Sequence, residues 1–73
     1  MKLNKQEQTV VVGHLINNVI GMELVKQHID PQKLEKAVAL HNDINDDMTP
    51  KQVREALINV LDKVIDDLLN SKE

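Results

Sequence analysis

The three histidines have the widest chemical range in this chain, because an imidazole can bind a metal, transfer a proton or form a hydrogen bond. They are His14, His28 and His41. If His14 and His28 share one helix, a rise of 1.5 Å per residue separates them by about 21 Å, too far for one metal ion. His41 shares a helical face with Leu34 and Val38, which is typical of a histidine at the margin of a core. The histidine spacing therefore predicts no metal site.

The chain also lacks side chains that catalysis and cofactor binding commonly use. The 73 residues include no Cys, Phe, Tyr or Trp, which excludes thiolate nucleophiles, disulfides, aromatic ligand cages and base-stacking platforms. A helical chain of this size uses its interior for its own packing and rarely encloses a substrate pocket. We therefore expect neither enzymatic activity nor a cofactor.

The acidic segment 43–47 invites comparison with a calcium loop, because Asp43, Asn45 and Asp47 occupy the first, third and fifth positions. The match fails at the sixth position, where Met48 replaces the glycine that the turn requires. It also fails at the twelfth, where Arg54 replaces the bidentate glutamate. The segment is better interpreted as a solvated turn before a helix.

A row of carboxylates recurs at helical spacing in the C-terminal third of the chain. Glu55, Asp62 and Asp66 share one helix face with Asn59. Such a row is most simply a solvated face. It can also offer repeated negative charges to a basic surface on a partner protein, so these three acids are candidate partner-binding residues.

Small residues form a second row, with Gly13, Asn17 and Gly21 spaced four apart in the N-terminal third. Each glycine costs a helix interior about 1 kcal/mol relative to alanine. The row therefore indicates either a close helix crossing or a break at Gly21, and the sequence leaves both open. As a groove of small residues, it is a second candidate partner-binding surface.

Three predicted helix starts determine which helices carry these candidate residues. Asn4 and Glu7 match a capping box, Asp30 precedes Pro31, and Thr49–Gln52 combines a capping box with proline at the first helical position. The segment between the second and third helices is rich in turn-forming residues, so the second helix should fray within it. The chain is predicted to be one all-α domain over residues 1–73, a small three-helix bundle with helices near 4–28, 31–44 and 50–70.

The third predicted helix is apolar over a sector of about 220°, much wider than one neighbouring helix can cover. One stripe is predicted to be core: Val53, Leu57, Val60, Leu61, Val64 and Leu68. A second flank contains Ile58, Ile65 and Leu69. The first helix is apolar around most of its circumference as well. Two such helices in a short chain predict a homodimer that buries the excess apolar faces, although a monomer with some exposed aliphatic surface is an alternative.

The length and the net charge of the chain indicate which classes of partner it can bind. A chain of 8.3 kDa has a small core, and self-association is the common supplement where disulfides and structural zinc are excluded. The net charge of −3 and the pI of about 5.5 oppose general affinity for nucleic acid or anionic lipid. No apolar run approaches the ~20 residues of a membrane span, so we expect a cytoplasmic protein without a membrane contact.

Exclusion of chemistry leaves binding as the expected function. We expect a small protein-binding or regulatory module that acts by occupying a partner protein's surface, with Gly13, Asn17, Gly21, Glu55, Asp62 and Asp66 as candidate contact residues. A nucleic-acid-binding helical dimer is one alternative, which the acidic row opposes. A purely structural subunit whose partner is a copy of itself is the other.

Overall fold

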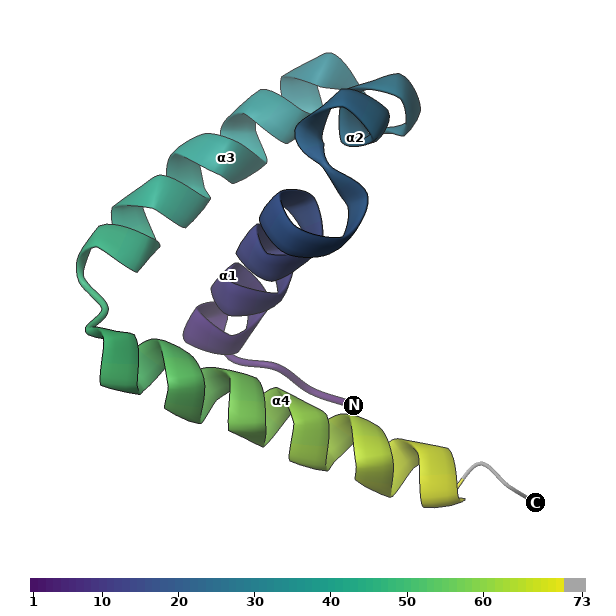
Figure 1. Ribbon diagram of the computed structural model, residues 1–73, viewed down its shortest axis with the longest axis vertical. Helices are drawn as coiled ribbons and strands as arrows, with labels where there is room; N and C mark the ends of the chain where they lie inside the picture. Colours follow the sequence, from purple (N-terminus) through teal and green to yellow (C-terminus); the bar gives the residue numbers. More distant parts are fainter. Residues whose placement is uncertain (71–73) are drawn as a thin grey trace.

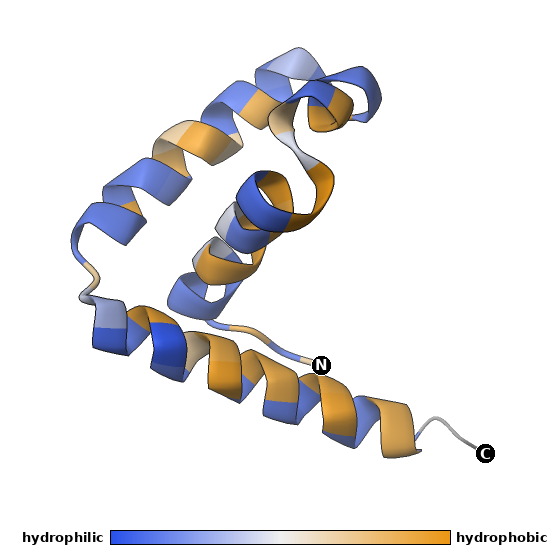
Figure 2. Ribbon diagram, in the orientation of Figure 1, coloured by the Kyte–Doolittle hydropathy of each residue, from blue (hydrophilic) through white to orange (hydrophobic). Residues whose placement is uncertain are grey.

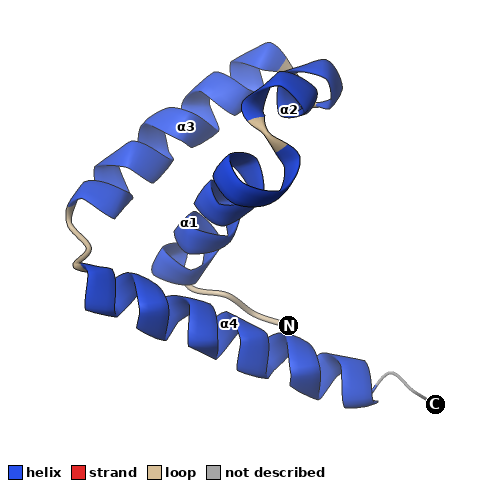
Figure 3. Ribbon diagram, in the orientation of Figure 1, coloured by secondary structure: helices blue, strands red, loops and turns tan. Residues whose placement is uncertain are grey.

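Helices account for nearly all of the computed structural model, which describes residues 1–70 (Figures 1 and 3). Residues 71–73 of the predicted domain lie outside this range. In chain order, the segments are α1 (Lys5–His14), the π-helical segment η1 (Leu15–Ile20), α2 (Met22–His28), α3 (Pro31–Asp46) and α4 (Pro50–Asn70). Residues 1–70 contain no strand, and the prediction of an all-α protein is confirmed.

Two reciprocal capping boxes fix the starts of α1 and α4. At α1, the Glu7 N–H donates to Asn4 Oδ1 at 2.8 Å, and the Asn4 N–H donates to Glu7 Oε1 at 2.9 Å. At α4, the Gln52 N–H donates to Thr49 Oγ1 at 3.1 Å, and the Thr49 N–H donates to Gln52 Oε1 at 2.9 Å. Each box satisfies two backbone donors that a helix start otherwise leaves without partners. Both predicted starts are confirmed.

The helix that begins at Pro31 starts as predicted, but its end differs slightly from the prediction. Asp30 accepts a hydrogen bond from the Lys33 N–H at 3.0 Å, with Pro31 at the first helical position. This helix ends at Asp46, two residues beyond the predicted end near residue 44 and within the turn-rich segment where it was expected to end. Half-buried Ile44 lies in this last turn, and its packing offsets the weak helix propensity of the acidic residues around it.

The first predicted helix, 4–28, is not continuous. After α1 the chain widens into η1, where the Gly21 N–H donates to the Ile16 carbonyl, five residues back, at 2.9 Å. Gly21 then takes φ 92° and ψ 141°, backbone angles that are essentially restricted to glycine. This turn ends the helix, and α2 begins at Met22. Residues 1–70 therefore contain four α-helices rather than the predicted three.

The helices form an open wedge (Figure 1). α3 and α4 diverge from the loop that joins them, α1 lies between them, and α2 folds back at the N-terminal end of α3. The buried apolar side chains among the described residues are Val10 from α1, Val25 from α2, Leu34 from α3 and Ala56 from α4. Although α4 is long, it thus contributes only the small residue Ala56 to the buried side chains among the described residues.

The wedge exposes more surface than a folded monomer of its mass ordinarily does. Its accessible area is 5887 Å², whereas about 4600 Å² is typical at 8.3 kDa. Its radius of gyration is 13.5 Å, against about 11 Å for a compact domain of this length. Much of the excess is aliphatic, including Leu15, Val19, Ile20 and Leu24 in the N-terminal third.

None of the helices in residues 1–70 combines the length and the apolar character that a membrane crossing requires.

Candidate protein-binding face

Helix α4 has two apolar sides with different surroundings. On the inner side Ala56 is buried and Val60 is half-buried. On the opposite side four large aliphatic residues form what we call the outer row: Ile58, Leu61, Ile65 and Leu68, which are 63%, 58%, 43% and 66% exposed. At 100° per residue the two sides are centred about 150° apart. One side holds α4 to the body, and the other presents aliphatic side chains to solvent.

The prediction that Leu61, Val64 and Leu68 belong to a core stripe is therefore wrong, because all three are exposed. α1 covers only the inner side of α4, and α3 diverges from α4 instead of packing along it (Figure 1). In Figure 2 the hydrophobic residues continue along α4 to its C-terminal end, well past the part that α1 contacts. The sequence does not separate this row from the core stripe, because both follow intervals of three and four residues.

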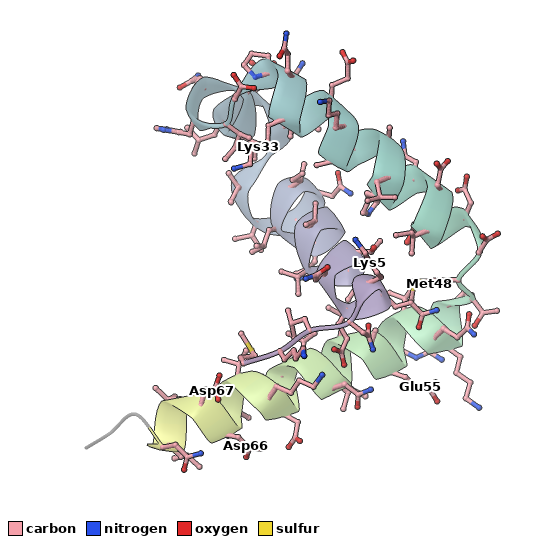
Figure 4. All side chains as sticks on the ribbon, turned by 180° about the vertical axis from the view of Figure 1, so that it is seen from behind. Lys5, Lys33, Met48, Glu55, Asp66 and Asp67 are labelled. Carbon is pink, nitrogen blue, oxygen red and sulfur yellow. The ribbon has the colours of Figure 1, made fainter. Side chains whose placement is uncertain are left out.

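The predicted acidic residues Glu55, Asp62 and Asp66 are all exposed and lie on one side of α4, about 100° from the centre of the outer row. We call them the acidic row. Figure 4 shows Glu55 and Asp66 on the edge of α4 away from α1, and Asp67 on the edge toward it. Asp67 differs in role, because its Oδ2 lies 3.1 Å from the amino group of Met1. The structure thus brings the three candidate acids together, beside the outer row.

An ion pair holds the inner side of α4 to α1. Lys63 Nζ donates to Glu7 Oε1 at 2.6 Å and to the Lys2 carbonyl at 3.0 Å. The Glu7 side chain is 4% exposed, whereas that of Lys63 is 39% exposed. The hydrogen bond from Lys63 and the backbone hydrogen bond from Asn4 lower the pKa of Glu7, and they outweigh the opposite effect of burial. This pair lies on the opposite side of α4 from the outer row and fixes which side faces solvent.

The small-residue row does not form one groove. Gly13 and Asn17 line a hollow of about 70 Å³ between α1 and α3 together with His41, whereas Gly21 forms the backbone break. A β-carbon at Gly13 would overlap the His41 ring, meeting Nε2 and lying 3.2 Å from Cδ2 and Cε1. The break therefore occurs at Gly21, whereas the close approach at Gly13 is not the helix crossing that the first interpretation required. The approaching group is a side chain rather than a helix backbone.

Substitution of Gly13 should reveal this contact. We expect Gly13→Ala to stabilise the His41→Ala variant by about 1 kcal/mol, the helix-propensity gain. In the native background the overlap with the His41 ring should cancel most or all of that gain. Urea denaturation of the four proteins of the cycle measures the coupling. An equal effect of Gly13→Ala in both backgrounds would contradict the close approach.

A second apolar surface lies between α2 and α3. This groove has a volume of about 390 Å³ and is lined by Met22, Lys26, Ile29, Pro31, Leu34, Glu35 and Val38. It depends on α2 folding back against α3, and the sequence did not indicate it because the sequence left open whether the first helix breaks at Gly21.

The remaining chemical candidates stay apart. His14 Nδ1 lies 3.0 Å from Asn18 Nδ2 in the exposed turn where α1 passes into η1, and His41 lies against Gly13. Within residues 1–70, no three His, Asp or Glu side chains gather closely enough to hold a metal ion.

Comparisons with protein-family models, curated proteins and solved structures found no match to this chain. Its function is therefore inferred from its own geometry.

Proposed function

We propose that this chain is a small protein-binding module that regulates a partner protein by occupying its surface. The contact surface is the outer row of α4 together with the neighbouring acidic row. The observation that carries this proposal is the exposure of Ile58, Leu61 and Leu68, each more than half accessible, in one continuous row on a helix whose opposite side packs against α1. Exposed apolar residues are ordinary when scattered, but a continuous patch rimmed by charges is typical of an interaction site.

The chemistry of the face indicates the chemistry of its partner. The partner protein is expected to present basic side chains to this face, because Glu55, Asp62 and Asp66 run beside the outer row. Such charges contribute selectivity and association rate more than affinity, while the aliphatic centre contributes most of the binding energy. The ion pair between Glu7 and Lys63 fixes the orientation of the face, so little order has to be gained on binding.

The module is proposed to assemble as a homodimer, as the wide apolar faces predict. The accessible area of about 1300 Å² beyond that of a typical monomer supports association. The same acidic row opposes the nucleic-acid alternative, because its carboxylates repel phosphate groups.

Site-specific photo-cross-linking in an extract of the source cells tests this function. A photoreactive apolar residue replaces Leu69, which is 63% exposed beside both rows, and the matched control replaces Gln32, an exposed residue of α3. We expect discrete protein adducts from position 69 and none from position 32. Reversing the charges of Asp62 and Asp66 to Lys should lower the adduct yield about tenfold, since each rim charge contributes roughly 0.5–1 kcal/mol.

The control for charge reversal is the pair Asp43→Lys and Asp46→Lys, which changes the net charge equally on the exposed end of α3. Equal loss of adducts from both pairs would show that net charge rather than the acidic row matters, and would overturn the proposed site. Adducts with nucleic acid alone would favour the nucleic-acid alternative. Adducts with copies of the chain alone would favour the self-assembling subunit.

A further inference from the structure

The spacing of the outer row matches a two-stranded coiled-coil seam. Ile58, Leu61, Ile65 and Leu68 follow one another at intervals of three, four and three residues, which places isoleucine at both a positions and leucine at both d positions of two heptads. Isoleucine at a with leucine at d favours parallel dimers over larger assemblies. The preceding a and d positions are Lys51 and Arg54, so the seam begins at Ile58.

We propose that the occupant of the outer row is a second copy of this chain, with the two α4 helices side by side in parallel. This inference rests on the proposed function, because it places the homodimer proposed there on the outer row. The acidic row of each copy lies about 100° away from the seam and is left for the partner protein. Each copy contributes its outer row to a shared apolar seam, and the inner sides of the two helices remain attached to their own α1.

The charges beside the seam favour the parallel orientation. In a parallel pair the flanking e and g positions bring Val64 next to Leu69 of the second copy, and Leu57 next to Asp62 of the second copy, so no two like charges meet. In an antiparallel pair centred on the same row, position e of one helix lies beside position e of the other helix. The two copies of Asp62 would then face each other, and such like-charge neighbours oppose pairing.

The exposed aliphatic surface of the chain supports association. The chain exposes about 1300 Å² more than a typical monomer of its mass, and the outer row contributes four of its exposed large aliphatic side chains. A seam of two heptads is short for isolated helices. Here α4 is already held as a helix by its packing against α1 and by the Glu7–Lys63 ion pair, so pairing does not have to supply the helix.

The first experiment measures the dissociation constant of the dimer by sedimentation equilibrium over a dilution series, with helicity followed by circular dichroism. We expect a dimer, and we expect Leu61→Glu to weaken it at least roughly 100-fold, because both copies lose a central apolar contact. The matched control is Val19→Glu, at a residue that is 63% exposed in η1, and it should change the constant less than about threefold. A native chain that stays monomeric at all concentrations overturns the inference, and so do equal effects of the two variants.

The orientation is tested with single cysteines, which are unambiguous because the chain has none of its own. In a parallel seam Ile58→Cys should form a disulfide with its own copy under mild oxidation. In an antiparallel seam the two copies of position 58 would lie about 15 Å apart along the axis, beyond disulfide reach, and the disulfide would instead form in a mixture with Leu68→Cys. Because Ile58→Cys keeps an apolar side chain, this test does not depend on a charged variant that could disrupt folding.

The proposed function and this inference can fail separately. If the chain is monomeric and position 69 still cross-links to a different protein, the proposed function stands, and the inference that a second copy occupies the outer row is overturned. A parallel dimer that yields no adduct with any other protein supports this inference and overturns heterologous binding through the face. A Gln32→Cys variant, placed on α3, serves as the control for random disulfide formation and should remain reduced in the dimer.

Discussion

Gly21→Ala is expected to lower the free energy of unfolding by about 1–3 kcal/mol. Gly21 has φ 92° and ψ 141°, and a β-carbon at these angles strains the backbone even though no atom lies within 4 Å of the position where it would stand. The strain could be relieved by running α1 straight into α2. That change would move Val25, one of the four buried apolar residues among those described, out of its position in the core.

Thermal and urea denaturation followed by circular dichroism would measure this effect. The informative control is D-Ala at position 21, introduced by chemical synthesis of the 73-residue chain, because a D-residue favours positive φ. We expect the D-Ala variant to be at least as stable as the native chain. If the L-Ala and D-Ala variants are equally stable, the break at Gly21 is not a conformational requirement, and the division of the first helix needs another cause.

Glu7→Gln is expected to destabilise the fold at neutral pH and to flatten its loss of stability in acid. Because the pKa of the Glu7 carboxyl is lowered below its ordinary value of 4.5 in the folded chain, folding favours the deprotonated form. This contribution is fully present above pH 4.5 and is lost as the pH falls through the folded-state pKa. Removing the carboxyl should reduce proton uptake on unfolding in that range by up to one proton.

Glutamine is the appropriate replacement, because its side-chain oxygen can still accept the Asn4 N–H and preserve the capping box. Denaturation midpoints measured from about pH 2 to 7 provide the readout, and Glu35→Gln on the exposed side of α3 provides a matched control that should leave the profile unchanged. Lys63→Met tests the other partner, and its effect should be much smaller in the Glu7→Gln background. Identical acid profiles for the Glu7 and Glu35 variants would contradict the assignment of the lowered pKa to this ion pair.

The two predictions concern the arrangement of the helices rather than the residues of the outer row. The Glu7–Lys63 pair joins the inner side of α4 to α1, and the Gly21 break lets α2 turn back to α3. The ion pair thus keeps the outer row on the side of α4 that α1 does not cover among residues 1–70. A variant that releases this pair should change the accessibility of the outer row without altering one of its residues.

The sequence was sufficient for the features that depend on neighbouring residues. The capping boxes at Asn4 and Thr49 and the Asp–Pro start at residue 30 are local hydrogen-bond patterns, so the helix starts follow from residue types alone. The common face of Glu55, Asp62 and Asp66 likewise follows from the helical repeat. Whether that acidic face binds a partner remains a proposal.

Tertiary structure decided which side of each helix was covered. Periodicity shows that α4 is apolar over a wide sector, but it does not show that α1 takes only the inner side and leaves Leu61 and Leu68 exposed. Gly13 and Gly21 belong to the same row of residues spaced four apart, so the sequence does not distinguish their roles. Their different roles depend on His41, which is distant in the chain but lies against Gly13, and on the backbone angles at Gly21. Hydrogen-bond caps act within one turn, whereas burial depends on the distant segments that fold against each face.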